Sequence, residues 1–317
     1  MIFDFLKQND IVDVVFPGTS SIFSEIEKIK VFLEKSNFVP RIFLERELTL
    51  KKTISHEFSS FDASKRFEQL KNAIEAPDSK IIWCARGGYG SAELLPFLTK
   101  LKKPKKEKIF IGFSDISSFN KLLIEEWGWK IVSAPVLAQI VLNKVSKKSE
   151  KVILNFILGK LSELKYELKS LTKLTTYDIR STTIVGGCIS VIASHFGTKN
   201  QINWKDKILF LEDEGESGER LDRYFSHMIN IMIENKSYPK AILLGNFLQA
   251  NPHGTPKAKN IKIAIERFIK KLAENKINFS VFEEKSKCLG HSKNMRPLVL
   301  GAEADITVDG FLVQKTI

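Results

Sequence analysis

The chain has 317 residues, of which 43% are hydrophobic and 27% are charged. At about 150 residues per domain this length predicts two domains, and the ordinary apolar share excludes wholesale disorder and fibrous repeats. No apolar run approaches the ~18 residues of a membrane span, and we see no basic and apolar regions of a secretory signal at the N-terminus. The three cysteines are widely spaced, which argues against a disulfide framework and favours the reducing cytoplasm.

The formal charge of +12 first suggests a polyanionic partner. Only nine of the 49 basic residues are arginine, however, whereas contacts to base edges and phosphates depend largely on arginine. We therefore interpret the excess as a lysine-rich solvated surface and expect no nucleic-acid partner. The runs Lys102–Lys108 and Lys144–Lys151 keep a basic nucleic-acid-binding protein as a competing hypothesis.

The first 150 residues alternate short apolar strands with amphipathic helices. This βαβα order predicts an N-terminal α/β domain, residues 1–150, built on a doubly wound, mostly parallel sheet. In chain order we expect a strand at Ile11–Phe16, a helix capped by Ser20 or Ser21, a strand entered at Val39, a helix at Ala63–Glu75, a strand at Lys80–Cys84, a helix ending at Leu95, a strand at Lys108–Gly112, a helix from Ser114 to Glu126, and a strand from Lys130.

The pattern breaks at residues 143–180, which we interpret as a helix plus a connection, with 151–180 as the connecting segment. A second series predicts a smaller α/β C-terminal domain, residues 181–317. Its expected elements are a strand at Thr183–Val185, a helix ending at Phe196, a strand at Lys207–Leu211, a helix at Arg220–Glu234, a strand at Ala241–Leu244, a helix at Ala258–Leu272, a strand at Ile277–Val281, and a strand–turn–strand at Ala304–Val313.

The segment IFIGFSDI, residues 109–116, places a serine between an apolar strand and a helix. This arrangement is typical of a nucleophile elbow, in which a sharp turn exposes the hydroxyl at the sheet edge. Ile116 stands where the full Gly-x-Ser-x-Gly signature needs its last glycine. Ser114 could equally be an ordinary helix N-cap, with Asp115 favoured by the helix dipole. The segment alone leaves both interpretations open.

The glycine-rich segment ARGGYG, residues 85–90, follows a strand. Its backbone N–H groups could approach a ligand closely, as an oxyanion hole requires, or the glycines could simply form a tight turn. The segment matches neither the dinucleotide fingerprint nor a Walker loop. We therefore expect no cofactor.

Two later residues bear on chemistry. Glu212 directly follows an apolar strand, near the sheet edge where ligands bind in open α/β folds, although any such acid can be a solvated loop charge. We interpret Asp213, Glu214 and Glu216 as such solvated charges. His291 lies in a late polar segment and could be structural or exposed. Because no second Cys/His pair accompanies Cys288 and His291, we expect no metal.

Together these segments provide a serine, an acid and a histidine in that chain order. Serine is a poor nucleophile at neutral pH and needs a base. Histidine is the usual base, and a carboxylate fixes its tautomer and stabilises the imidazolium. The set is therefore chemically sufficient for acyl transfer, although the order does not identify a fold.

The same segments resemble the LD-carboxypeptidases (murein tetrapeptide carboxypeptidases) and their relatives, the microcin-immunity peptidases. The resemblance covers nearly the whole chain and is most specific in ARGGYG followed by GFSD at residues 112–115. It also includes PGTSS at residues 17–21, Arg66, GGCISVIASHFGT at 186–198, LFLEDEGE at 209–216 followed by RLDR, LLGNF at 243–247, and the final GH and PLVLG.

The resemblance implies a cytoplasmic serine peptidase without a metal. Ser114 would be the nucleophile, Glu212 the orienting acid and His291 the base, with backbone N–H groups of Gly88 and Asp115 as the oxyanion hole. The serine would come from the N-terminal domain and its partners from the C-terminal domain, so that the active site lies between them. The family is typically dimeric and removes the terminal D-Ala from recycled murein tetrapeptides, which implies a muropeptide substrate, a homodimer and no membrane insertion.

The candidates for substrate contact are Ser20, Arg86, Tyr89 and Arg296. The two arginines are close in sequence to proposed site residues and could bind a substrate carboxylate. The chain departs from the family pattern at Ser133-Ala134-Pro135, where His-Gly-Pro is usual, at Cys188, where the family has asparagine, and at Glu219, where it has tyrosine. These departures affect the expected substrate contacts and not the triad.

The nearest rival function is an immunity-type peptidase that cleaves a peptidyl-nucleotide toxin. Such an enzyme should carry an aromatic platform for the base. The four tryptophans are candidates, but their strand or near-strand positions favour packing in the core. They are Trp83, Trp127, Trp129 and Trp204.

Overall fold

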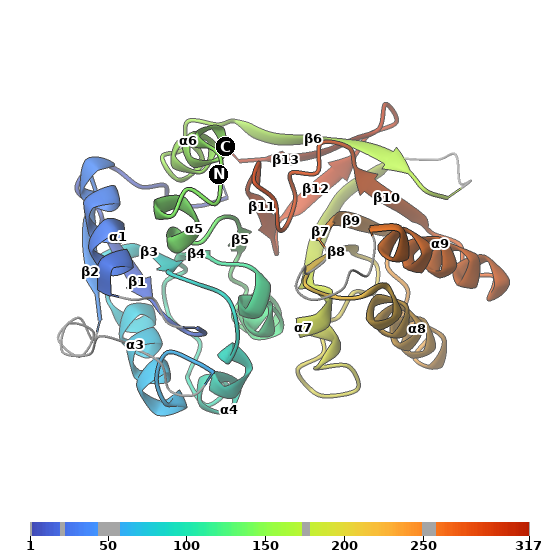
Figure 1. Cartoon of the computed structure of the whole chain (residues 1–317), viewed down its shortest axis with the longest axis horizontal. Helices are drawn as coiled ribbons and strands as arrows, with labels where there is room; N and C mark the ends of the chain where they lie inside the picture. Colours follow the sequence, from blue (N-terminus) through green and yellow to red (C-terminus); the bar gives the residue numbers. More distant parts are fainter. Residues whose placement is uncertain (1, 20–22, 44–57, 173–177, 249–257, 317) are drawn as a thin grey trace.

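A computed structural model describes residues 2–19, 23–43, 58–172, 178–248 and 258–316. Two α/β units lie side by side, the N-terminal one at the left of Figure 1 and the C-terminal one at the right. The two chain ends meet, since the Ile2 N–H donates to the Thr316 carbonyl over 3.1 Å. None of the helices in the described ranges is long and apolar enough to cross a membrane.

The N-terminal unit is built on a six-stranded sheet in the order β11-β5-β4-β3-β1-β2. Five strands are parallel, and β11 is antiparallel to β5. The inner strands are almost continuously apolar, as expected when helices cover both faces of a parallel sheet. The strands are β1 (Ile11–Val15), β2 (Val39–Ile42), β3 (Ser79–Cys84), β4 (Ile109–Ile111), β5 (Ile131–Ser133) and β11 (Leu298–Leu300).

This strand order places a crevice at one edge of the sheet. The chain passes from β1 to β2 in one direction and from β3 to β4 and β5 in the other. Ligands of open α/β sheets bind outside the carboxyl ends of the strands at such a reversal point. The segments that leave β1 and β3 are residues 16–19 and the glycine-rich residues 85–90, so the fold brings these two motifs together.

The N-terminal unit contains helical elements of very different length. They are α1 (Phe23–Lys35), α3 (Ala63–Glu75), the 3₁₀ turn η1 (Ser91–Leu94), α4 (Leu95–Leu98), the 3₁₀ helix η2 (Ser114–Phe119), the π-helix η3 (Leu122–Glu126), α5 (Leu137–Val141) and α6 (Lys147–Ile157). The stretch expected as one helix from Ser114 to Glu126 is helical throughout, but its winding changes from 3₁₀ in η2 to π in η3. Such departures from α geometry are frequent at functional sites.

The C-terminal unit contains a closed seven-stranded barrel in the order β10-β6-β13-β12-β7-β8-β9. Strands β7, β8, β9 and β10 run parallel, and the other pairs are antiparallel. The strands are β6 (Glu163–Ser170), β7 (Ile179–Cys188), β8 (Ile208–Glu214), β9 (Ala241–Leu248), β10 (Ser280–Glu284), β12 (Glu303–Ile306) and β13 (Phe311–Lys315).

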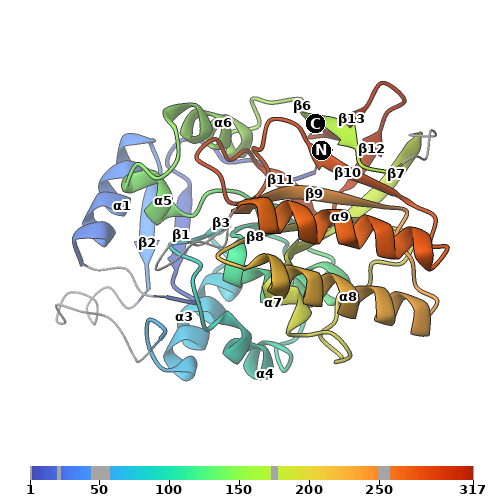
Figure 2. The ribbon, with the colours of Figure 1, turned by 45° about the vertical axis from the view of Figure 1, so that its right-hand side comes forward.

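Three helices pack on this barrel, namely α7 (Ile189–Ala193), α8 (Gly218–Glu234) and α9 (Ala258–Glu274). Figure 2 shows α8 and α9 side by side across the parallel strands. Their apolar faces and one face of these strands form one buried cluster, which includes Leu209, Phe225 and Phe268. The barrel interior belongs instead to the core that begins in the N-terminal unit, so residues such as Phe210 connect the two units through continuous packing.

Two segments depart from the expected division of the chain. Residues 151–180 are more than a helix and a connection, because β6 closes the barrel between β10 and β13. Its burial alternates, with Leu164, Tyr166 and Leu168 facing inward between exposed charges, and this period-two pattern was hidden by the Lys/Glu-rich composition. Strand β11 lies in the C-terminal stretch of the sequence but pairs with β5 in the N-terminal sheet.

Candidate active site

Ser114 occupies a strained turn at the end of the central strand β4. Its φ is +63°, a left-handed conformation that few residues other than glycine adopt. Two glycines make room for it: a Cβ on Gly112 would lie 2.9 Å from Ile116, and one on Gly87 would lie 3.2 Å from the Ser114 Cβ. The N-cap position of η2 falls on Phe113, and no side chain caps the helix. The capping alternative for Ser114 is therefore wrong, and its geometry is that of an elbow.

Glu212 and His291 form a buried pair. The Glu212 Oε2 lies 2.6 Å from His291 Nδ1 and also accepts the His291 backbone N–H over 3.0 Å. Both side chains are nearly inaccessible to solvent. Glu212 lies inside β8 rather than after it, opposite Cys188 of β7. A carboxylate at Nδ1 favours the tautomer with its proton on Nδ1 and a free lone pair on Nε2. A general base needs this tautomer.

The loop that carries His291 is fixed by hydrogen bonds from the barrel. Glu284 accepts the backbone N–H groups of Ser286 and Cys288, each over 2.7 Å. Asn246 donates its side-chain amide to the His291 carbonyl over 2.6 Å. The loop can approach Glu212 only because residue 290 is glycine, since a Cβ there would lie 2.6 Å from the Glu212 Cβ. The histidine is thus positioned by backbone and packing as well as by its acid.

The charges around His291 favour its protonated form. Burial lowers the pKa of His291, but the carboxylates of Glu212, Glu214 and Asp213 outweigh this effect and raise the pKa above its ordinary value. The ring also packs on Phe113, with 4.6 Å between the ring centroids. The residue preceding Ser114 therefore contacts the proposed base directly.

Ser114 and His291 line one pocket of about 320 Å³. Gly87 and Gly88 from the segment after β3 form another part of its wall, together with Thr19, which follows β1. Its remaining lining residues are Arg86, Phe113, Val136, Ala138, Gln139, Leu142, Lys144 and Glu214. Among the described residues, no hydrogen bond joins Ser114 Oγ to His291 Nε2, a contact that often tightens only when substrate binds.

The glycine-rich segment is held by Thr19. The Thr19 N–H donates to the Gly87 carbonyl over 3.0 Å, and its hydroxyl accepts the Tyr89 N–H over 3.0 Å. Gly88, between them, has a φ of +92°, and a Cβ there would collide with the Thr19 hydroxyl.

Asp115 fixes the residue that follows the glycine-rich segment. It is buried, accepts the Ser91 N–H over 2.9 Å, and its pKa is raised by burial. These contacts lock the two segments expected to supply oxyanion donors.

The two units are hydrogen-bonded to each other next to the site. The Asn120 amide donates to the Gly186 carbonyl over 2.7 Å, and the Cys188 N–H donates to the Ser117 hydroxyl over 3.0 Å. Ser117 lies in η2 and Asn120 directly follows this helix, whereas β7 lies beside β8 and therefore beside Glu212. This seam sets the position of the serine relative to the acid and the histidine.

The expected substrate contacts are only partly brought together. Arg86 lines the pocket, but its guanidinium also forms a bidentate pair with Glu25 of α1, at 2.5 and 3.1 Å. Tyr89 is 59% exposed and contacts the ring of Phe58 outside the pocket lining. Arg296 stacks on Tyr166, 4.7 Å from its ring centroid, which removes it from the pocket wall. Ser20 lies outside the described residues, as does Ser21, the other cap expected for α1.

The structure adds pocket residues that the sequence interpretation assigned to solvent. Glu214 and Lys144 both line the pocket. Glu214 could have been found from Glu212, because residues two apart on a strand share one face. Lys108, at the end of an expected solvated run, is buried beside Ser79 and Asp13. In the run from Lys144 to Lys151, the helix expected within residues 143–180 begins at Lys147 as α6.

The described part of the chain holds no group of three metal-ligating side chains. Its three cysteines are free and buried, and burial raises the pKa of Cys288 to about 12, so this thiol is neutral. All four tryptophans are buried in the core, as their positions favoured. Neither a metal site nor a tryptophan platform is therefore available to the pocket from these residues.

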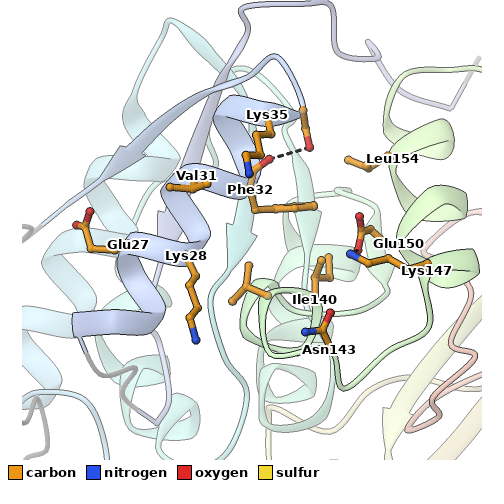
Figure 3. A pocket seen from close by; sticks show the side chains of 12 residues that line it. Glu27, Lys28, Val31, Phe32, Lys35, Ile140, Asn143, Lys147, Glu150 and Leu154 are labelled. Atoms are coloured by element: carbon orange, nitrogen blue, oxygen red, sulfur yellow. Dashed lines mark hydrogen bonds and ion pairs between the residues drawn. The ribbon is translucent and has the colours of Figure 1, made fainter.

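A second pocket of about 640 Å³ lies between α1, α5 and α6 (Figure 3) and has no described lining residue in common with the Ser114 pocket. Its floor contains Phe32, Ile140 and Leu154, and lysine and glutamate side chains surround it. Its lining includes no histidine, cysteine or aspartate among the described residues. The hydroxyl and the imidazole needed for acyl transfer therefore lie together in the pocket of Ser114 and not in this one.

Comparisons with known proteins identify the family of both units. A family model described as the LD-carboxypeptidase N-terminal domain matches residues 12–134, and one for the LD-carboxypeptidase C-terminal domain matches residues 181–306. A putative carboxypeptidase of Rickettsia prowazekii is 34% identical over 186 residues, which are 57% of this chain and 57% of that protein. A murein tetrapeptide carboxypeptidase of Pseudomonas aeruginosa is 30% identical over 191 residues, 58% of this chain and 61% of that protein. These matches span less than two thirds of each relative's length.

Solved structures show the same fold at low identity. A muramoyltetrapeptide carboxypeptidase from Oxalobacter formigenes superposes with a TM-score of 0.74 at 22% identity, covering 96% of this chain and 97% of that one. An MccF-like protein from Bacillus anthracis gives a TM-score of 0.76 at 22% identity, with both chains fully covered. A microcin C7 self-immunity protein gives 0.74 at 16% identity, covering 99% and 98% of the two chains. The two-domain α/β architecture is therefore shared over the whole length.

Proposed function

We propose that this chain, which belongs to the LD-carboxypeptidase family, is a serine peptidase that releases the terminal D-Ala from murein tetrapeptides. The cut would fall after the diamino acid. The substrate proposal follows the names of the relatives, among them the tetrapeptide carboxypeptidase of Pseudomonas aeruginosa. The cytoplasmic location and homodimer implied by the family resemblance remain predictions.

The observation that carries the serine mechanism is the shared pocket of Ser114 and His291. Ser114 stands on a left-handed turn, and His291 is held by the buried Glu212 carboxylate 2.6 Å from its Nδ1. A hydroxyl, a base and an orienting acid from three separate segments meet at the crevice between two units. A merely structural histidine would not need to share a pocket with a partly exposed serine.

In the proposed mechanism, His291 Nε2 accepts the Ser114 proton as Oγ attacks the scissile carbonyl carbon. The backbone N–H groups of Gly88 and Asp115 stabilise the oxyanion, each donor being worth about 3–4 kcal/mol in comparable sites. The imidazolium then gives its proton to the leaving amine of D-Ala, and the acyl group remains on Ser114. Water attacks that acyl carbon while His291 takes its proton, which finally returns to Ser114 Oγ.

A second candidate is a peptidase of the microcin-immunity type. The one observation in its favour is the exposed aromatic pair of Phe58 and Tyr89, whose ring centroids are 6.1 Å apart. Tyr89 directly follows Gly88 of the pocket, so this pair could stack on a nucleobase that extends from the site. The same triad chemistry would then act on an acyl-nucleotide conjugate.

The test is incubation with a murein tetrapeptide and mass spectrometry of the product. We expect loss of one D-Ala by the wild type, and a fall in turnover of several orders of magnitude in Ser114→Ala. Ser118→Ala is the matched control, because its hydroxyl is buried on the same helix without a hydrogen-bond partner among the described residues. Full activity of Ser114→Ala would overturn the nucleophile, whereas cleavage of an acyl-nucleotide conjugate alone would favour the second candidate.

A further inference from the structure

Glu214 places a second carboxylate on the proposed base. It is the last residue of β8, two positions after Glu212, and its Oε2 lies 3.5 Å from His291 Nε2. The side chain is 52% exposed and lines the pocket. Its backbone is fixed by pairing with Leu248 of β9. The imidazole is thus flanked by a buried acid on one nitrogen and an exposed acid on the other.

This arrangement conflicts with the chemistry that His291 must perform. A neutral imidazole carries one N–H, whereas the imidazolium donates from both nitrogens. With carboxylates at Nδ1 and Nε2, both nitrogens face acceptors, which suits the imidazolium. A general base, however, needs a free lone pair on Nε2 directed at the serine hydroxyl. The approach of Glu214 to Nε2, at 3.5 Å, therefore competes with the role of that nitrogen as a base.

The other charges around the ring do not cancel this effect. Asp213, on the same strand, is buried and adds negative charge. The cations that line the pocket are Arg86, which already binds Glu25, and Lys144. Phe113 and Ser114 approach from the N-terminal unit without charge. Among Glu212, Asp213 and Glu214, only Glu214 has a side chain exposed enough to move away from the ring.

We propose that Glu214 is a positioning residue that acts through His291: without substrate its carboxylate holds Nε2, and substrate must displace it before Ser114 can use that nitrogen. When the carboxylate leaves, the imidazolium releases its Nε2 proton to water and becomes the base. The inference rests on the proposed role of His291. It assigns to Glu214 the control of the pH at which the enzyme becomes active.

The first test reads His291 directly and needs no substrate. NMR titration of the histidine ring in the intact protein, with the signal assigned through His291→Gln, gives the midpoint of its protonation. We expect a lower midpoint in Glu214→Gln and a midpoint close to wild type in Glu214→Asp, which keeps the charge. Glu216→Gln is the matched control, because it removes an equal charge two residues further on, where the partner is Arg220.

The second test is the pH profile of kcat/KM. Measured relative to its own alkaline plateau, Glu214→Gln should be about two- to fivefold more active than wild type on the acidic limb, as expected for an exposed charge pair. A merely structural role would lower activity equally at every pH. An unchanged His291 midpoint in Glu214→Gln, or the same shift in Glu216→Gln, would overturn the inference.

The two proposals fail in different ways. If Ser114→Ala kept its activity, the proposed function would fall, while the NMR midpoints would still report whether Glu214 holds His291. If Glu214→Gln left the midpoint unchanged, the positioning role would fall, while tetrapeptide cleavage by Ser114 would stand.

Discussion

The side-chain amide of Asn120 donates a 2.7 Å hydrogen bond to the carbonyl of Gly186, across the seam between the two units. Asn120 is buried and follows Ser114 by six positions, and Gly186 lies on the strand next to the one that carries Glu212. Together with the bond from the Cys188 N–H to the Ser117 hydroxyl, this bond connects the segment of the proposed nucleophile to the strand beside its acid, although the two come from opposite halves of the chain.

Asn120→Ala should loosen this seam. The change leaves the buried Gly186 carbonyl without its partner, which costs about 1–3 kcal/mol of folding stability. We also expect kcat to fall while KM changes little, because the distance between Ser114 and His291 is no longer fixed. Urea denaturation and steady-state kinetics measure the two effects. Ser118→Ala, which removes a buried hydroxyl with no partner among the described residues, should change neither. Equal behaviour of the two variants would contradict this role.

Ser114 should be a site where activity and stability oppose each other. Its φ of +63° costs a non-glycine residue roughly 1 kcal/mol, and glycine is free of that strain. Ser114→Gly and Ser114→Ala should both be inactive, but Ser114→Gly should be the more stable by about 1 kcal/mol. Thermal denaturation of the two variants side by side is the measurement. A Ser114→Gly protein less stable than Ser114→Ala would argue against strain at this turn.

Glu212→Gln should disable His291 without unfolding the protein. The amide keeps the shape of the acid but removes the charge that fixes the Nδ1–H tautomer, and a comparable change in another serine peptidase lowers kcat about 10⁴-fold. We expect a loss of that order in kcat with a nearly unchanged circular dichroism spectrum. A loss of less than about tenfold would mean that Glu212 does not orient the base.

Gly290→Ala should damage the site more than its backbone angle alone explains. Its φ is +82°, and a Cβ there would lie 2.6 Å from the Glu212 Cβ and 2.5 Å from its Oε2. Gly197 is the matched control, because its φ is +76° and no atom of the described residues would lie within 4 Å of a Cβ added there. Gly197→Ala should lose roughly 1 kcal/mol and keep its activity. Gly290→Ala should lose more stability and nearly all activity in the same assays.

Asp213 should make the fold less stable as the pH rises through the weakly acidic range. Burial raises the pKa of Asp213 to about 6, above the ordinary value of 3.8. A carboxyl with a raised folded pKa favours the fold while protonated, so its contribution is present below pH 4 and is lost between about pH 4 and 6. The loss amounts to about 2–3 kcal/mol.

The measurement is urea denaturation of wild type and Asp213→Asn across this range. Because the amide does not ionise, the stability of the variant relative to wild type should increase from about pH 4 to pH 6 and then level off. Asp309→Asn is a suitable control, since the pKa of this exposed carboxyl is lowered, mainly by a hydrogen bond to Thr307. A constant difference between Asp213→Asn and wild type would show that Asp213 does not titrate there.

Several local features could be predicted because they depend on neighbouring residues. The apolar strands β1, β3 and β8 and the long amphipathic helices α3, α8 and α9 lie close to their expected ranges. Their signals are periodicity and turn residues, which a single segment carries by itself. The motif pair ARGGYG and GFSD likewise indicated the segments that the fold brings to the crevice. Strand β6 was not predicted, because charged residues separate its inward-facing residues and only closure of the barrel buries the latter.

The pocket contacts could not be predicted, because they depend on where side chains end after folding. Arg86 and Arg296 are equally basic in the sequence, yet one lines the pocket and the other stacks on Tyr166. Glu214 was interpreted as a loop charge, although the extension of β8 places it beside His291. Neither the charge of a side chain nor its distance in sequence from a site residue specifies where that side chain points. Strand register and packing fix that direction.

The composition of this chain determined its class, since length and apolar share predicted two packed domains, and a +12 charge made mostly of lysine indicated surface rather than function. The sequence also determined which residue types were available for acyl transfer. Only the tertiary structure decided that Ser114 and His291 share one pocket, that Glu212 lies 2.6 Å from the histidine ring, and that Glu214 lies 3.5 Å from its other nitrogen. The reason is physical: the segments that carry Ser114, the two acids and His291 are far apart in the sequence. Packing within the C-terminal unit brings β8 to His291, and the seam between the sheet and the barrel brings Ser114 to the same pocket.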